Sequence, residues 1–190
     1  MEKEFNIIIT GVGGQGLITL LRVLAGAAFL QGFDVKTSEL HGLSQREGSV
    51  QAHIRFGKQI FSPLIGKEKA DLILGLEACE VLRIIDFLGK KTPLLINKKF
   101  IPYLKGPSEK EVFEKINKIS GKIHFVDASR ICQEKFGQEV LATVFLLGSA
   151  ISKRLLPLKP TFVLKAIKKI VPKEFFDANK KAFQLGQKYV

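Results

Sequence analysis

The side chains best suited to chemistry lie in two glycine-containing segments of the first fifty residues. The first, Gly11–Gly16, reads Gly-Val-Gly-Gly-Gln-Gly and spaces its glycines as G-x-G-x-x-G. This spacing lets a backbone turn tightly and approach an anionic ligand at the start of a helix. The second, Glu39–Gly48, contains a carboxylate, an imidazole, an amide and a guanidinium around two glycines. Backbone N–H groups and a guanidinium both bind phosphates and carboxylates, so the two segments indicate an anion-binding site.

The glycine segment has two interpretations. Gly11, Gly13 and Gly16 let the backbone come close to a ligand, or they only let the following helix pack close to a sheet. Gly14 and Gln15 favour a ligand, because the turn needs neither of them and Gln15 places an amide at the start of the helix. We therefore assign all five residues to cofactor binding.

The second segment contains the candidate catalytic residues. We assign proton exchange to His41 and anion binding to Arg46. Alternatively, His41 makes only structural hydrogen bonds, and Arg46 forms a salt bridge with Glu39 or Glu47 that shapes the loop. Glu39 follows the glycines at about the twenty-residue spacing at which a dinucleotide-binding fold holds the ribose hydroxyls. Cofactor binding is assigned to Glu39 and to the other glycine and amide positions of the segment, which are Gly42, Gln45 and Gly48.

The elements around these segments predict a Rossmann-like α/β fold. Ile7–Thr10 is a β-branched run typical of a buried central strand, and Leu17–Gln31 is an apolar run of helical length. A second strand is expected at Phe33–Ser38, which completes a strand–helix–strand crossover. Because α/β sheets bind ligands at the carboxyl ends of their strands, both glycine segments are expected at one edge of the sheet.

The remaining sequence alternates strands with helices. The strand from Ser49 to Phe56 is expected to continue through a tight Gly57-Lys58 turn into an antiparallel partner at Gln59–Ser62. Further strands are expected at 71–76, 93–97 and 123–126, and helices at 78–88, 108–119, from 127 or 129, and at 139–153, 160–170 and 173–189. The prediction is a single domain, residues 1–190, with three α/β/α layers, a mostly parallel sheet and one antiparallel hairpin.

Composition excludes several classes of protein. Cys79 and Cys132 lie far apart and belong to no C-x-x-C pair, so we expect no disulfide framework, zinc site or iron–sulfur cluster from this chain alone. No apolar run is long enough to span a bilayer, and residues 1–4 do not begin a basic-then-apolar leader. We therefore expect a cytoplasmic protein with no membrane association and no metal of its own.

Positive charge is concentrated in the second half of the chain. Residues 1–89 contain 9 Lys or Arg against 10 Asp or Glu, whereas residues 90–190 contain 21 against 8. This imbalance indicates an acidic partner, or a solvated lysine-rich surface of the kind found in heat-adapted proteins. Only six of the basic residues are arginine and the chain has no tryptophan, so the base stacking of single-strand binders has little support. We favour the solvated surface and expect no nucleic acid.

The two segments together resemble a known family. Gly11–Gly16, followed by Glu39, His41-Gly42 and Gln45–Val50, is similar to the gamma domain of the 2-oxoacid:ferredoxin oxidoreductases. Within that family the sequence is most similar to the members that act on indolepyruvate. Asp71–Glu77 also resembles the family's third parallel strand with its terminal acid.

The resemblance implies a function for a complex rather than for this chain alone. Such a complex decarboxylates a 2-oxoacid, here an aryl pyruvate such as indolepyruvate, forms the acyl-coenzyme A and passes electrons to ferredoxin. Thiamine diphosphate and the 4Fe–4S clusters would lie in a large partner subunit, with coenzyme A as co-substrate and this chain inactive by itself. The two glycine segments would face the partner's active site, where they meet the phosphates of coenzyme A.

Several points stay open at this stage. Glu47 stands where the family usually has a glycine, which puts close backbone approach at that turn in doubt. A stand-alone nucleotide-binding module or small dehydrogenase is the alternative function, and a nucleic-acid binder is a third. The residues do not separate aryl pyruvate from pyruvate, branched-chain 2-oxoacids or 2-oxoglutarate.

Overall fold

A mixed sheet of six strands is the middle layer of the computed structural model, which describes residues 4–42, 48–119 and 122–189. The strands are β1 (Phe5–Val12), β2 (Asp34–His41), β3 (Ser49–Gly57), β4 (Leu72–Gly75), β5 (Leu94–Asn97) and β6 (Ile123–Val126). Their order across the sheet is β2-β3-β1-β4-β5-β6. β1, β4, β5 and β6 are parallel, whereas β3 is antiparallel to both of its neighbours, β1 and β2. The predicted α/β class with a mostly parallel sheet is confirmed.

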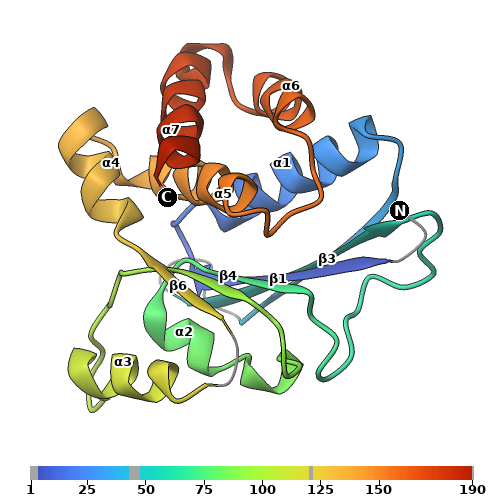
Figure 1. The fold of residues 1–190 in the computed structure, drawn as a ribbon. Coiled ribbons are helices and arrows are strands. Elements are labelled where there is room, and N and C mark those ends of the chain that lie inside the picture. Colours follow the sequence, from blue (N-terminus) through green and yellow to red (C-terminus); the bar gives the residue numbers. More distant parts are fainter. Residues whose placement is uncertain (1–3, 43–47, 120–121, 190) are drawn as a thin grey trace.

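Helices cover both faces of this sheet (Figure 1). They are α1 (Leu17–Leu30), α2 (Ala78–Leu82), η1 (Ile85–Phe87), α3 (Glu109–Asn117), α4 (Ala128–Phe136), η2 (Glu139–Leu141), α5 (Ala142–Ser152), α6 (Pro160–Ile170), η3 (Lys173–Phe175) and α7 (Phe176–Lys188), where η marks a 3-10 helix. In Figure 1, α1, α5, α6 and α7 lie on one face of the sheet, and α2 and α3 lie on the other.

Strand β1 is buried on both faces, as its β-branched run predicts. Ile7, Ile8 and Ile9 are fully buried. Because side chains alternate along a strand, Ile7 and Ile9 pack into the core under α1 and α5, and Ile8 packs into the separate core under α2 and α3. The strand is therefore fixed from both sides, which gives the glycine segment that follows it a rigid base.

The expected hairpin at Gly57-Lys58 is wrong. The residues after β3 form a loop, and the antiparallel partners of β3 are β1 and β2. Side chains on the sheet hold this loop, because Ile60 N–H donates to Asp34 Oδ2 at 2.8 Å and Ile65 N–H donates to His53 Nδ1 at 3.0 Å. With both of its edges already paired, β3 has no edge left for a further strand.

Most helices follow the local sequence signals, although the helices expected at 139–153 and 173–189 begin with the 3-10 helices η2 and η3. α6 has the predicted bounds, and Ser108 begins α3 with the expected capping box, in which Ser108 N–H donates to Glu111 Oε2 at 2.7 Å. The helix expected over 78–88 ends at Leu82 and is followed by η1. There the N–H groups of Arg83 and Ile84 bond to carbonyls three residues back, so the chain tightens into 3-10 turns.

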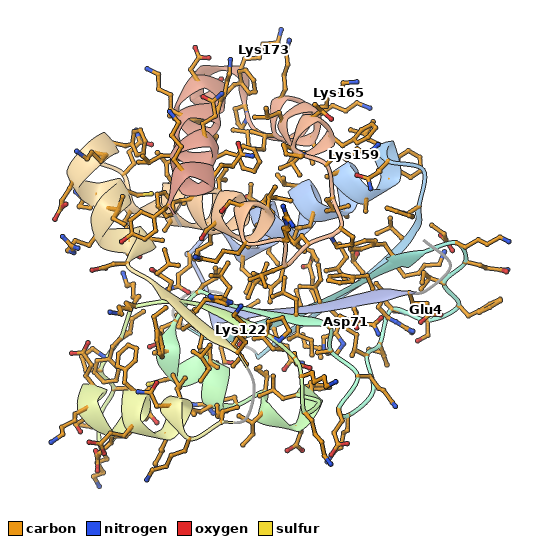
Figure 2. The ribbon with its side chains drawn as sticks, viewed as in Figure 1. Glu4, Asp71, Lys122, Lys159, Lys165 and Lys173 are labelled. Carbon is orange, nitrogen blue, oxygen red and sulfur yellow. The ribbon has the colours of Figure 1, made fainter. Side chains whose placement is uncertain are left out.

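Lysines of the basic second half lie on the outer surface. Figure 2 shows Lys165 on α6 and Lys173 on η3 pointing away from the sheet, and both are exposed. Among the described residues, no Lys or Arg between 153 and 188 forms an ion pair with a carboxylate. No helix in this part of the chain, or elsewhere in the described residues, is long and apolar enough to cross a membrane.

Candidate functional site

A cavity of about 630 Å³ opens where β1, β4 and β5 end. Its walls come from the glycine segment, from the start of β3, from the loops after β4 and β5, and from the starts of α4, η2 and α5. The lining residues include Val12, Gly13, Gly14, Gln15, Ser49, Glu77, Cys79, Glu80, Arg83, Asn97, Lys99, Tyr103, Ser129, Glu139 and Thr143. The carboxyl ends of parallel strands are the usual place for a ligand in an α/β sheet.

The glycine segment divides between the cavity wall and the interior. Gly13, Gly14 and Gln15 line the cavity. Gly11 lies behind them, and a Cβ atom there would come within 2.6 Å of Gln15 Oε1 and 2.9 Å of Leu76 Cβ. Gly16 has a φ of 80°, a conformation that favours glycine, and directly precedes α1. Two of the five predicted glycine-segment residues therefore shape the loop, and three face the cavity.

The side chain of Gln15 forms a hydrogen bond with the backbone of its own glycine segment. Its Oε1 atom accepts a hydrogen bond of 2.8 Å from the backbone N–H of Val12. The amide oxygen is thus used within the loop, and the rest of the side chain forms part of the cavity wall. This bond also explains Gly11, because any side chain there would displace the amide.

Gly48, at the end of the second glycine segment, contacts the first segment. Gly13 N–H donates to the carbonyl oxygen of Gly48 at 2.9 Å, and Val12 of β1 is paired with Ser49 of β3. Gln45 and Arg46 belong to residues 43–47, which lie outside the described residues, as does the side chain of His41. The exposed Gly42 is not among the residues that line the cavity.

Glu39 lies away from the glycine segment. It is exposed on β2 and paired with Ala52 of β3, and it does not line the cavity. Because β3 separates β2 from β1, two strand spacings, or about 10 Å, lie between β2 and β1. A dinucleotide-binding fold places its acidic residue on the strand next to the glycine loop, so this sheet order does not reproduce that arrangement.

Glu77, the acid that follows β4, is the N-cap of α2. It is 1% exposed and precedes α2, where its Oε2 accepts from Glu80 N–H at 2.9 Å. Its Oε1 accepts from Ile101 N–H at 3.0 Å, which ties down the loop after β5. Burial raises the pKa of the Glu77 carboxyl, against the opposing effect of the two backbone donors. Both oxygens are engaged, so Glu77 supports the wall of the cavity.

Sequence reasoning missed a cluster next to Glu77. Glu80 is only 6% exposed, and its two carboxylate oxygens accept from Ser49 Oγ and, at 3.1 Å, from Arg83 Nε. The available signal was a Glu-x-x-Arg pair at positions i and i+3, a spacing common on exposed helix surfaces. Cys79 lies beside them, and burial together with the carboxylates of Glu77 and Glu80 raises the pKa of its thiol to about 11. The thiol is therefore protonated at neutral pH and poorly nucleophilic.

The opposite wall is held by Asn97 and by an ion pair. The side-chain Nδ2 of Asn97 donates to Leu76 O at 3.1 Å and to Ser129 Oγ at 2.8 Å, which joins β5 to the end of β4 and to α4. Lys99 is paired with Glu139, and this hydrogen bond lowers the pKa of the Glu139 carboxyl. Among the described residues, no group of three His, Cys, Asp or Glu side chains could hold a metal ion.

Comparison with known proteins agrees with this architecture. The family model of pyruvate ferredoxin/flavodoxin oxidoreductases matches residues 6–189. The chain is 38% identical to the indolepyruvate oxidoreductase subunit IorB of Pyrococcus horikoshii over 194 residues, which covers 98% of this chain and 96% of that subunit.

Solved structures of this type share the fold. The pyruvate oxidoreductase subunit PORC of Thermotoga maritima superposes with a TM-score of 0.74 at 25% identity, covering 98% of this chain and 96% of PORC. The 2-oxoglutarate:ferredoxin oxidoreductase of Magnetococcus marinus superposes with a TM-score of 0.78 at 15% identity, and the match covers 99% of this chain but 31% of that one. By its near-complete match to the family model and its similarity to IorB, the chain belongs to the pyruvate ferredoxin/flavodoxin oxidoreductase family.

Proposed function

We propose that this chain, as one domain over residues 1–190, is the small subunit of a 2-oxoacid:ferredoxin oxidoreductase that acts on indolepyruvate or another aryl pyruvate. The observation that carries the proposal is the 38% identity to an indolepyruvate oxidoreductase subunit over nearly the full length of both chains. The pyruvate and 2-oxoglutarate enzymes share the fold at lower identity. An aryl pyruvate is therefore the favoured substrate.

The redox cofactors of such a complex are assigned to a larger partner subunit. Cys79 and Cys132 are both buried, and burial raises the pKa of the Cys132 thiol to about 12. Two separate buried thiols do not fit a 4Fe–4S cluster, which takes four cysteine thiolates. Thiamine diphosphate and the clusters would then belong to the partner, with ferredoxin as the electron acceptor. The 31% share of the 2-oxoglutarate enzyme that corresponds to this chain leaves most of such an assembly for those groups.

The cavity is the proposed site for coenzyme A. Gly13 and Gly14 place backbone on its wall without side chains, as close approach to a phosphate requires. Gln45 and Arg46 are proposed to complete this anion site from the adjoining segment, and His41 to exchange a proton there. When bound, coenzyme A would supply the thiol that accepts the acyl group. The residues of this chain would orient it toward the partner's active site.

Reconstitution tests the proposal. The purified chain should not reduce ferredoxin, whereas the chain combined with its large subunit should do so only with both an aryl pyruvate and coenzyme A. Pyruvate and 2-oxoglutarate serve as comparison substrates. Turnover by the chain alone would contradict the subunit role, and saturable NAD or FAD binding by the isolated chain would favour a stand-alone nucleotide-binding module.

A further inference from the structure

Three side chains form a continuous set of contacts along one wall of the cavity. Ser49 Oγ donates to Glu80 Oε2, and Arg83 Nε donates to Glu80 Oε1 at 3.1 Å. All three residues line the cavity. Ser49 also directly follows Gly48, whose carbonyl oxygen accepts from Gly13 N–H at 2.9 Å. The position of the Arg83 guanidinium is thereby tied to the backbone of the glycine segment.

The guanidinium of Arg83 is held by the hydrogen bond from its Nε to Glu80, and its Nη groups remain available to a ligand. Its side chain is 57% exposed, and within the described ranges its two Nη atoms donate to no acceptor. Arg55 is different, because its Nε and both Nη atoms donate to groups of the same chain. Lys99, another cation of the cavity wall, is engaged by Glu139. Arg83 thus offers two adjacent Nη groups to whatever enters the cavity.

Burial of Glu80 explains how this orientation is maintained. A carboxylate that is 6% exposed must be hydrogen-bonded, and Glu80 has one donor on each oxygen. Its backbone is fixed as well, since Thr10 Oγ1 donates to the Glu80 carbonyl oxygen at 3.3 Å and Glu80 N–H donates to Glu77. A guanidinium held through Nε keeps its Nη groups in the fork geometry that matches a phosphate or a carboxylate.

We propose that Arg83 binds an anionic group, a phosphate or a carboxylate, of the molecule that occupies the cavity, and that Glu80 and Ser49 are its positioning residues. The inference rests on the proposed function, which supplies two candidate ligands. The anion is a phosphate of coenzyme A or the carboxylate of the 2-oxoacid. If Arg83 instead only neutralised Glu80, its replacement would lower stability and leave ligand affinity unchanged.

Titration of the full-length chain and of its complex with the large subunit tests the proposal. Coenzyme A and indolepyruvate are the two probes. Arg83→Gln should weaken the binding of one probe by about ten- to a hundredfold, the range for a lost charge-assisted hydrogen-bonded pair, and the affected probe identifies the anion. Arg83→Lys still neutralises Glu80 but loses the fork, so the affinity for the same probe should be intermediate. Glu80→Gln should give a smaller loss for that probe.

The matched control is Arg130→Gln. Arg130 is similarly exposed on α4, pairs with Asp127 and Glu134, and is not among the cavity-lining residues. In the active complex, Arg83→Gln should raise the KM of the affected probe and leave kcat largely unchanged. Equal dissociation constants and KM values for Arg83→Gln and Arg130→Gln would overturn the inference, as would a wild-type complex that binds neither probe. A complex that binds a probe through Arg83 but shows no turnover would refute the proposed function alone.

Discussion

Helix α5 contributes Ala142, Thr143 and Leu146 to the cavity wall and packs closely against α7. Adding a methyl group at Gly186 of α7 tests this close packing. A Cβ atom on Gly186 of α7 would overlap the carbonyl oxygen of Phe145 and lie 2.9 Å from its carbonyl carbon. Gly148 of α5 is in a reciprocal position, where a Cβ atom would lie 3.1 Å from the carbonyl carbon of Phe183. Backbone touches backbone at both points, so a side chain cannot turn aside to make room.

The cost of Gly186→Ala follows from these distances. Ordinary contact begins at 3.4 Å, so the 2.9 Å distance to the carbonyl carbon by itself requires the helices to separate by about 0.5 Å, and the overlapping carbonyl oxygen requires a larger movement. A gap of about 0.5–1 Å loses roughly a quarter to a half of the dispersion energy of the atoms that face it. Overpacking of this kind costs up to about 3 kcal/mol, and replacing a helical glycine by alanine returns about 1 kcal/mol. The net loss of about 2 kcal/mol should lower Tm by about 4–8 °C in a chain of this size.

Thermal and urea unfolding of Gly186→Ala and Gly26→Ala make the comparison. Gly26 is also helical, but a Cβ atom there would meet the flexible end of Ile170 at 3.1 Å, so Gly26→Ala should be neutral or stabilising. The Phe145 side chain is fully buried beside Leu146, which lines the cavity, so displacement of α5 should also weaken ligand binding. If Gly186→Ala unfolded at or above the temperature of Gly26→Ala, the inferred backbone contact would be refuted.

Two further predictions concern buried polar groups. Glu77→Gln places an amide NH₂ against a backbone N–H, so it should lower the free energy of unfolding by about 1–3 kcal/mol in urea titrations. The exposed Glu109→Gln is its control, and an equal effect of both would contradict the N-cap role. Burial lowers the pKa of His53, whose Nδ1 accepts from Ile65 N–H. The unfolded chain therefore binds the proton more readily, and the stability that His53 contributes should be complete above pH 6.5 and be lost as the pH falls toward its folded pKa. An NMR titration that placed the pKa of His53 at or above 6.5 would contradict this.

Local signals in the sequence predicted much of the fold. The burial of Ile7–Ile9 follows from an uninterrupted β-branched run, and the start of α3 follows from the Ser108 capping box. The hairpin expected at Gly57-Lys58 is wrong because local composition does not decide which strands pair. Gly57-Lys58 has the composition of a tight turn, but the partner of a strand is decided by distant residues, and here β1 pairs with β3 over eight positions.

The candidate site was predictable only in its backbone part. The cavity lining by Gly13, Gly14 and Gln15 follows from a glycine pattern with a known use at the ends of strands. Glu80 and Arg83 gave no comparable signal. A glutamate followed three residues later by an arginine is the same sequence pattern whether the pair lies on a solvated helix or in a cavity wall. Their roles depend on burial and on Ser49, which is thirty-one residues from Glu80 in sequence.

The antiparallel strand β3 explains why the two glycine segments meet. β1 and β2 run in the same direction, so both end at the edge of the sheet where the cavity opens. A connection from β2 to a parallel neighbour would have to leave this edge and cross the sheet. Because β3 is antiparallel, the connection from Gly42 to Gly48 begins and ends at this edge, and the register that pairs Val12 with Ser49 brings Gly48 to Gly13. The same register delivers the Ser49 hydroxyl to Glu80, so the pairing of β1 with β3 helps to place the glycine segment and the Arg83 guanidinium around one cavity.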